Sequence, residues 1–253
     1  MNIFQAVILG ILQGVAEFLP VSSSGHFVLF GKILGVEEQS MTFDIMLHIA
    51  TLIPVCSVYR KELLGIIGKP MQKMTYLLIV GTIPAVIAAL LFKDRIEALF
   101  GGGKSLSLAF FCTGIMLLFT DRIKDKGKKE ITYKDSLIIG IMQAIAMIPG
   151  ISRSGSTIAG ALYRKLDREE AAKYSFLLSV VAVLGATVLA AKDIITGDNT
   201  GEVFNASYIA GFIAAALSGY LAIQFMIKLI NECKLRYFSI YVFVLGILVL
   251  IFL

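Results

Sequence analysis

The residues that could do chemistry gather in two short segments of this 253-residue chain. The first, EFLPVSSSGH at 17–26, combines a carboxylate, three serine hydroxyls and an imidazole. The second, PGISRSGST at 149–157, combines a guanidinium with further hydroxyls. A guanidinium offers a planar fork of donors to phosphate oxygens, and small residues that open a helix expose backbone N–H groups to an anion. The two segments together therefore predict a site for a phosphate ester or a diphosphate.

The types of these residues suggest their roles. Glu17, with Gln13 one turn earlier, is predicted to hold Mg²⁺ or Ca²⁺, because these cations take oxygen ligands and bridge a carboxylate to substrate phosphate. Ser23 or His26 is the candidate nucleophile, and His26 is alternatively a general acid or base. The sequence does not choose among Ser23, His26 and water. The predicted substrate-binding residues are those at the two turns: Ser22, Ser24, Gly25, Ser152, Arg153, Ser154, Gly155 and Thr157.

Structural interpretations stand beside these roles. The serines at the turns would also satisfy backbone groups freed where a helix is broken. Arg153 would also serve as the partner of Glu17 rather than of an anion, and Glu17 as a buried neutral acid. Asp44 and His48 lie one helical turn apart, where they are expected to pair or to cap a helix.

Composition limits the elements that can position these residues. The chain is 57% hydrophobic and 16% charged, whereas soluble domains are about 25% charged, so a soluble enzyme is excluded. The net charge of +5 does not indicate nucleic acid, because the basic residues lie between apolar blocks. Uncharged runs long enough to cross a bilayer predict an all-α integral membrane protein with six transmembrane helices at about 41–59, 74–92, 105–120, 174–191, 207–227 and 237–253.

Two further apolar stretches, 2–35 and 135–163, are each broken in the middle by Pro, Gly and Ser. Such breaks are typical of two half-helices joined by a turn, so both stretches are predicted to be re-entrant helical hairpins. Residues 10–26 align with 140–156 with seven identities in 17 positions, which indicates an internal repeat.

Three predicted spans lie between the two hairpins, so the second hairpin must enter from the opposite face. The fold is therefore predicted to be an inverted-topology repeat within a single membrane domain, 1–253, with its site near the midplane. Repeat one covers about 1–120 and repeat two about 135–253, with a cytoplasmic linker at about 121–134.

The basic residues predict the orientation. Seventeen Lys and Arg residues fall in connections on one side and five on the other, with Arg153 set aside, so the first side is predicted to be cytoplasmic and both termini outside. The start of the chain lacks the positive region of a cleavable signal peptide, so the N-terminus is predicted to be retained.

Three other patterns in the sequence do not predict a functional site. GGGKS at 101–105 resembles the end of a phosphate-binding loop, but Ala98 stands where the first glycine belongs, so an external turn is expected. The run RIKDKGKK at 122–129 is expected to be a solvated cytoplasmic loop. Cys56, Cys112 and Cys233 are too scattered to predict a disulfide framework or structural zinc.

The chain resembles the bacterial undecaprenyl-diphosphate phosphatases, also known as the bacitracin-resistance proteins. The resemblance rests on QGVAEFLPVSSSGH at 13–26 and PGISRSGST at 149–157, with FDIMLHIATL at 43–52 and SFLLS at 175–179 in support. It implies hydrolysis of undecaprenyl diphosphate to undecaprenyl phosphate and inorganic phosphate in the bacterial cell membrane. It also implies that bacitracin competes for the same lipid, and it leaves a homodimer open.

Carried over by position, the resemblance assigns Glu17 and Gln13 to a metal-associated motif, Ser23 and His26 to the catalytic turn, and Arg153 to diphosphate binding. Gln13 stands where many members have Glu, which weakens a two-carboxylate metal site. Val181 stands where a Pro is expected. The rival interpretation is a transporter or flippase of an anionic polyprenyl phosphate lipid, because inverted repeats with broken helices are typical of transporters.

Overall fold

A computed structural model describes residues 1–36, 41–99, 103–123, 127–128, 130–196, 205–232 and 234–252. GGGKS and the basic run at 122–129 lie partly outside the described residues, and Cys233 lies wholly outside them.

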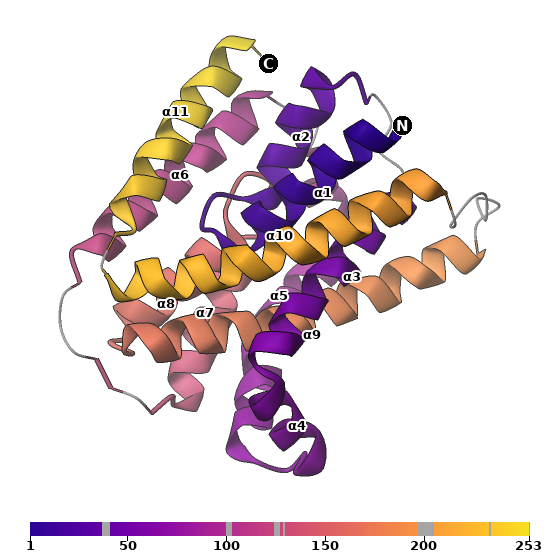
Figure 1. Ribbon diagram of the computed structural model, residues 1–253. Coiled ribbons are helices and arrows are strands. Elements are labelled where there is room, and N and C mark those ends of the chain that lie inside the picture. The colour runs from indigo at the N-terminus through magenta and orange to yellow at the C-terminus, as the bar shows by residue number, and fades with distance from the viewer. Residues whose placement is uncertain are drawn as a thin grey trace.

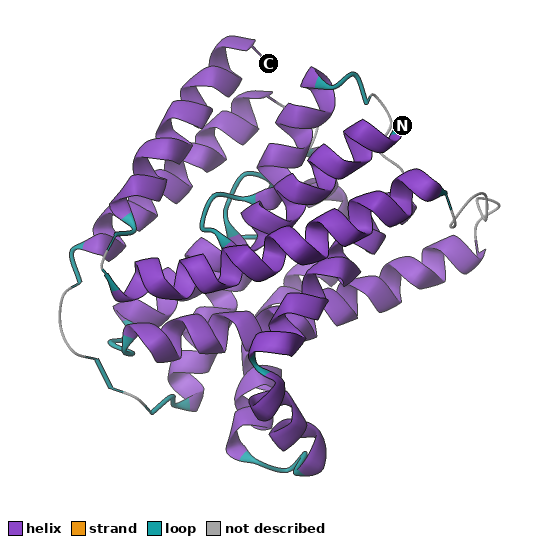
Figure 2. Cartoon of the chain, in the orientation of Figure 1, coloured by secondary structure: helices purple, strands orange, loops and turns teal. Residues whose placement is uncertain are grey.

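The described residues form eleven helices and no β-strand (Figures 1 and 2). A single isolated bridge joins Lys128 to Leu166. In chain order the helices are α1 (Ile3–Phe18), α2 (Ser23–Ile33), α3 (Met41–Val58), α4 (Arg60–Gly68), α5 (Lys73–Ala98), α6 (Gly103–Asp121), α7 (Tyr133–Ile145), α8 (Arg153–Tyr163), α9 (Arg168–Thr196), α10 (Ala206–Asn231) and α11 (Arg236–Phe252).

Both broken stretches are interrupted where Pro, Gly and Ser occur in the sequence. Helix α1 ends at Phe18, because the next residue takes an extended backbone ahead of Pro20. Helix α7 ends at Ile145, and the chain turns through Gly150, whose φ is +92°, before α8 begins. The loops of the two interruptions lie in the middle of the molecule (Figure 2).

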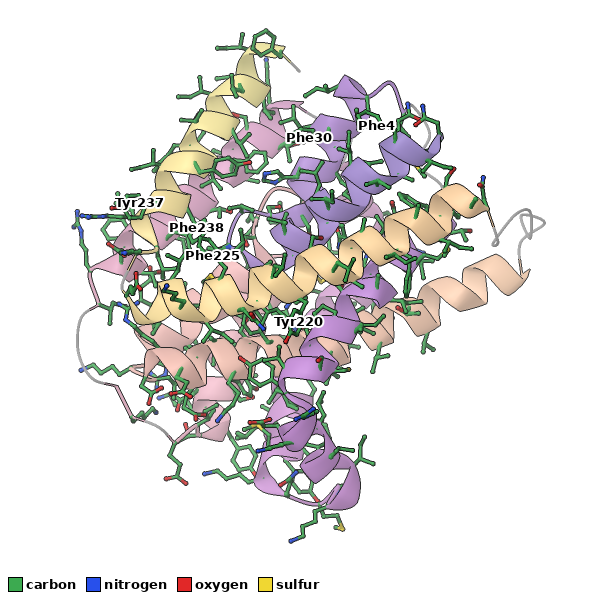
Figure 3. All side chains as sticks on the ribbon, viewed as in Figure 1. Phe4, Phe30, Tyr220, Phe225, Tyr237 and Phe238 are labelled. Atoms are coloured by element: carbon green, nitrogen blue, oxygen red, sulfur yellow. The ribbon has the colours of Figure 1, made fainter. Side chains whose placement is uncertain are left out.

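Four helical segments are long and apolar enough to cross a membrane: Lys73–Ile96, Gly103–Asp121, Arg168–Val188 and Ala206–Ile230. A fifth results if α3 and α4, which meet at a bend of 90°, count as one span. The expected sixth span is α11, a shorter apolar helix of 17 residues. The outer surfaces carry large exposed apolar side chains, among them Phe4, Phe225 and Tyr237 (Figure 3). The chain is therefore a multi-pass membrane protein.

Glycines allow the closest helix contacts. A Cβ atom at Gly10 of α1 would lie 2.2 Å from the carbonyl oxygen of Gly211 in α10. A Cβ atom at Gly140 of α7 would lie 2.3 Å from the carbonyl oxygen of Gly81 in α5. Small residues let helix backbones approach this closely in a membrane protein. Each of the two interrupted stretches thus packs against a long helix from the other half of the chain.

Helices α6 and α11 form a second kind of pair, side by side at one edge of the molecule (Figure 1). The Ser107 hydroxyl of α6 donates to the Gly246 carbonyl of α11 over 2.7 Å, and the Ser239 hydroxyl of α11 donates to the Gly114 carbonyl of α6 over 2.6 Å. These two bonds are reciprocal, since each helix supplies one serine donor and one glycine acceptor.

A charged network fixes the start of α7. Asp135 is fully buried and accepts hydrogen bonds from the Lys128 ammonium, the Arg164 Nε at 2.8 Å and the Thr132 hydroxyl at 2.7 Å. Burial alone would raise the pKa of Asp135, but these donors outweigh burial and hold the pKa well below its usual range. The network ties the segment before α7 to the end of α8.

We expect Asp135→Asn to lower the free energy of unfolding at pH 7 by about 2–3 kcal/mol, because it removes the acceptor of several charge-assisted hydrogen bonds. A depressed pKa in the folded state stabilises the fold above the unfolded pKa of about 3.9. The difference between wild type and variant should therefore shrink as the pH falls below about 4.

The measurement is unfolding in detergent at pH 7 and at lower pH, with the exposed Asp94→Asn as the matched control. An equal loss in both variants, or a difference that does not depend on pH, would contradict the assignment.

Candidate active site

The turn after α1 places the first group of side chains. Helix α1 carries Gln13 and Glu17 on a buried face, and the chain then turns so that α2 begins at Ser23. Ser22 is the N-cap residue of α2, and its hydroxyl accepts from the Gly25 backbone N–H over 3.3 Å. Ser22 has a φ of +69°, a conformation that costs a non-glycine residue about 1–3 kcal/mol.

The turn after α7 is built in a similar way. Ser152 is the N-cap residue of α8, and its hydroxyl accepts from the Gly155 backbone N–H over 3.1 Å. Arg153 is the first residue of α8. The Thr113 hydroxyl of α6 donates to the Gly150 carbonyl over 3.1 Å and accepts from the Ser152 N–H over 3.2 Å, which fixes the turn against α6.

The two turns touch each other. The Ser154 hydroxyl donates to the Leu19 carbonyl over 3.0 Å, and the Gly150 N–H donates to the Ser24 hydroxyl over 3.5 Å. These bonds join segments that lie about 130 residues apart in the chain, and they bring Arg153 to Glu17.

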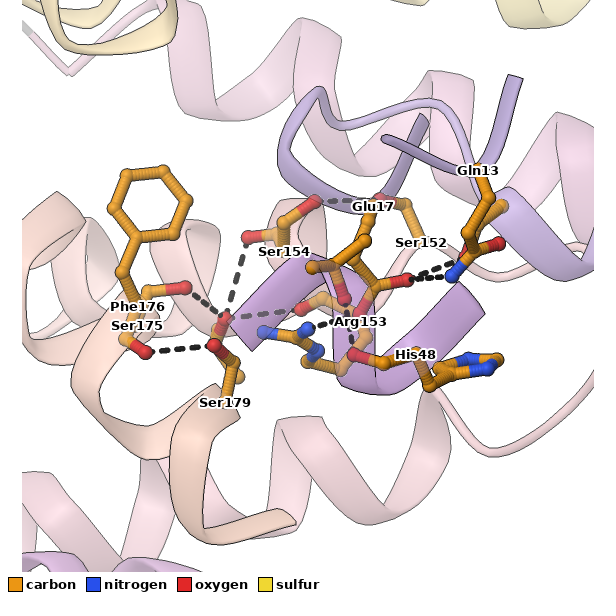
Figure 4. A network of polar contacts seen from close by, with 12 residues as sticks. Gln13, Glu17, His48, Ser152, Arg153, Ser154, Ser175, Phe176 and Ser179 are labelled. Atoms are coloured by element: carbon orange, nitrogen blue, oxygen red, sulfur yellow. Dashed lines mark hydrogen bonds and ion pairs between the residues drawn. The ribbon is translucent and has the colours of Figure 1, made fainter. Parts of the chain in front are cut away.

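Glu17 is the centre of the site (Figure 4). Its Oε1 accepts from Nη2 of Arg153 in an ion pair, and its Oε2 accepts from the Ser23 hydroxyl over 2.8 Å and from Nε2 of Gln13 over 3.1 Å. Glu17 is 8% exposed and Arg153 is 18% exposed, so the pair is largely removed from water. A carboxylate that accepts the hydroxyl proton of Ser23 is placed to take that proton.

One nitrogen of the Arg153 guanidinium has no hydrogen-bond partner among the described residues. This nitrogen, Nη1, is buried, while Nη2 is paired with Glu17. A buried, unpaired guanidinium N–H is costly unless a ligand meets it. Arg153 is therefore the partner of Glu17, and its Nη1 is left as a donor that an anion could meet.

The other predicted binding residues are mostly engaged by the protein. Ser24 and Ser154 lie in the contact between the turns, and the hydroxyls of Ser22 and Ser152 cap α2 and α8. Their hydroxyl bonds support the structural interpretation.

The remaining three predicted binding residues are also held by the protein. The Thr157 hydroxyl is 2.6 Å from the Ser175 hydroxyl of α9, and it donates to the Arg153 carbonyl over 2.9 Å. Gly25 packs so closely on the Phe110 ring that a Cβ atom would lie 2.5 Å from it, and the N–H of Gly155 is used in its cap.

The two histidines lie in different surroundings. His26 does not bond to Glu17 or Arg153; its ring nitrogens meet the Ser22 carbonyl and the Tyr241 hydroxyl. His48 lies near Glu17, close enough for the two side chains to interact electrostatically (Figure 4). Its Nδ1 donates to the backbone carbonyl of Asp44 over 2.8 Å, and the His48 and Asp44 side chains also interact electrostatically, as expected for residues one helical turn apart.

The sequence does not predict that His48 lies near Glu17, because nothing in FDIMLHIATL indicates which face of α3 meets α1. The available signal is its rarity, since the chain has only two histidines and His48 falls within the predicted span at about 41–59.

The donor set argues against a cation held by the protein alone. Both oxygens of Glu17 already accept hydrogen bonds, and the Gln13 amide presents its nitrogen, not its oxygen, to Glu17. The described residues contain no group of three or more His, Cys, Asp or Glu that could hold a metal ion. Gln13 and Glu17 therefore do not fit a complete divalent-cation site in this arrangement.

Known proteins are similar in sequence to this chain over nearly its whole length. The family described as "Bacitracin resistance protein BacA" matches residues 6–248. The chain belongs to this family. Membership in the BacA family confirms the resemblance that the motifs around Glu17 and Arg153 indicated.

Individual relatives agree with this assignment. The chain is 46% identical over 254 residues to the undecaprenyl-diphosphatase of Carboxydothermus hydrogenoformans, covering 99% of this chain and 97% of that protein. It is 46% identical over 252 residues to undecaprenyl-diphosphatase 4 of Bacillus thuringiensis strain Al Hakam, covering 99% and 97%. It is 41% identical over 257 residues to the undecaprenyl-diphosphatase of Halothermothrix orenii, covering 99% and 98%.

Proposed function

We propose that this chain hydrolyses undecaprenyl diphosphate to undecaprenyl phosphate and inorganic phosphate. The observation that carries the proposal is that Glu17, Ser23 and Arg153 lie together. Glu17 is a proton acceptor, Ser23 supplies a hydroxyl, and Arg153 supplies an N–H donor for an anion. The substrate is inferred from the names of relatives that match over nearly their whole length, which are called undecaprenyl-diphosphatases, and from the BacA family. Because undecaprenyl phosphate is the lipid carrier of cell-wall synthesis, the enzyme would recycle this carrier. It would also contribute to bacitracin resistance.

The geometry suggests how these residues work. Ser23 Oγ attacks the terminal phosphorus while its proton passes to Oε2 of Glu17, and the bond from that phosphorus to the bridging oxygen breaks. Undecaprenyl phosphate leaves with the electron pair, and Nη1 of Arg153 donates to the phosphoryl oxygens. Water then attacks the phosphorus of the phosphoserine, and the bond from that phosphorus to the Ser23 oxygen breaks. Glu17 returns its proton to the departing Ser23 oxygen, and inorganic phosphate leaves with the oxygen and protons of the water.

We propose that a divalent cation binds together with the substrate and not to the protein alone. Mg²⁺ is often bound through one carboxylate and several substrate phosphate oxygens, so the diphosphate itself would supply most ligands beside Glu17. The bonds already made by Glu17 and Gln13 favour this arrangement over a cation resident in the protein.

The proposal includes the inverted repeat, with repeat one at about 1–120, a linker at 121–134, repeat two at about 135–253, and both termini outside the cytoplasm of a bacterial cell. The contact of Gly10 with Gly211 and that of Gly140 with Gly81 support it, since both pairs are related by one shift of 130 residues. The reciprocal serine bonds between α6 and α11 support it as well.

The test is release of inorganic phosphate from undecaprenyl diphosphate by the purified full chain in detergent, with Mg²⁺, with Ca²⁺ and with a chelator. We expect release above background, abolished in Ser23→Ala and retained in the exposed control Ser57→Ala. A folded, lipid-supplemented sample that releases no phosphate would contradict the phosphatase and favour lipid transport.

A further inference from the structure

The turn that presents Ser23 is held from behind by His26. The carbonyl oxygen of Ser22 accepts the backbone N–H of His26 over 3.2 Å and lies 2.7 Å from Nδ1 of the same residue. Ser22 is the residue with the positive φ, and Ser23 follows it directly. The imidazole therefore bonds to the strained peptide that sets the direction of the Ser23 side chain.

Both ring nitrogens of His26 are occupied. A carbonyl oxygen only accepts, so Nδ1 carries a proton and donates it to Ser22. In the neutral ring Nε2 then accepts from the Tyr241 hydroxyl of α11, which lies 2.8 Å away. No lone pair or proton of this ring is left to reach a phosphate.

Aromatic rings enclose the imidazole. The ring of Phe30 is stacked with it at 6.3 Å between centroids, the ring of Tyr241 is stacked at 5.7 Å, and the ring of Phe110 meets it edge-on at 6.0 Å. His26 is 2% exposed. Tyr241 is the only titratable side chain among these three neighbours, and Glu17 and Arg153 do not bond to the ring.

We propose that His26 is a positioning residue, which holds the Ser22 turn so that the Ser23 hydroxyl meets Glu17, rather than a nucleophile or a general acid or base. The inference rests on the proposed phosphatase function. It extends the site to Tyr241, because α11 clamps the turn through Nε2 of His26. Displacing a reacting group by about 1 Å costs about 100-fold in rate, so the loss of the bond between His26 and the Ser22 carbonyl should affect the rate strongly.

The His26→Asn substitution distinguishes a positioning role of His26 from a role as nucleophile or general acid or base. The asparagine amide nitrogen occupies nearly the place of Nδ1 and can donate to Ser22, but it neither titrates nor forms a phosphoryl intermediate. We expect kcat of His26→Asn to stay within about tenfold of wild type, with an unchanged pH profile, while kcat of His26→Ala falls about 100-fold. Tyr241→Phe should lower kcat by less than about tenfold, because the bond to Ser22 remains.

A His26→Asn variant as inactive as His26→Ala, or one that lacks a limb of the wild-type pH profile, would overturn the proposal. Phosphate release by the wild type in the same assay tests the phosphatase itself, so the two failures are distinguishable.

A second measurement does not depend on activity or on a variant of His26. The chain has only two histidines, so ¹⁵N-histidine NMR spectra of wild type and His48→Gln in detergent assign the His26 ring directly. We expect a single tautomer protonated at Nδ1. An Nε2-protonated tautomer, or a ring that exchanges freely between tautomers, would overturn the proposal.

Discussion

Phosphate release by the Glu17→Gln variant is expected to fall to about one thousandth of the wild-type rate, because general-base catalysis contributes roughly 10²–10⁴-fold. The amide cannot take the proton of Ser23, and Arg153 loses its counter-charge at the same time. The measurement is single-turnover phosphate release in detergent, with unfolding followed in parallel to show that the variant remains folded.

Glu130→Gln is the matched control, because Glu130 is an exposed residue that pairs with Lys73, and among the described residues no hydrogen bond or ion pair joins it to Glu17, Ser23 or Arg153. A Glu17→Gln variant that keeps more than a tenth of the activity would remove Glu17 from the chemistry. If Glu17 and Arg153 act as one unit, Arg153→Ala should cost less in the Glu17→Gln background than in the wild type.

Gly10→Ala and Gly140→Ala are expected to destabilise the protein by about 3 kcal/mol each. The added Cβ atom would lie 2.2 Å from the Gly211 carbonyl oxygen in the first case and 2.3 Å from the Gly81 carbonyl oxygen in the second. Backbone atoms cannot move aside as a flexible side chain can, so the helices must separate, and overpacking of this kind costs about 1–3 kcal/mol or more. Thermal unfolding in detergent measures the loss.

Gly185→Ala in α9 is the control, since nothing lies within 4 Å of its added Cβ atom. It should be neutral or stabilising by up to about 1 kcal/mol, because alanine favours a helix over glycine. Equal behaviour of the three variants would show that the glycine contacts do not hold the helices together.

The sequence predicted the helix breaks well, because Pro20 and Pro149 with their glycine and serine neighbours cannot continue a helix. It also predicted that a carboxylate and a hydroxyl would meet the Arg153 guanidinium. The predicted imidazole in that group was His26, but His48 is the one near Glu17, and the environment of His26 depends on Tyr241, which is 215 positions away. Such contacts follow from how α3 and α11 pack, and local patterns carry no information about packing.

The spans were harder to predict than the turns. The predicted span at about 41–59 ends at Tyr59, where α3 and α4 meet at a bend of 90°, because the charged residues Arg60 and Lys61 follow. Hydropathy did not predict the helix α4 beyond the bend. Helix α9 begins at Arg168, before the predicted start at 174, because charged residues open its first turn.

The pairing of α1 with α10 has a consequence for how the protein is made. A chain is synthesised from its N-terminus, so Ile3–Phe18 enters the membrane long before Ala206–Asn231 exists. Until then the glycine face of α1 lacks its α10 partner, and Glu17 lacks the Arg153 guanidinium until α8 has been made. The residues of the site are therefore all made before the helix that packs along α1, and a ribosome that stops after α9 leaves a product in which Gly10 has no α10 backbone to pack against.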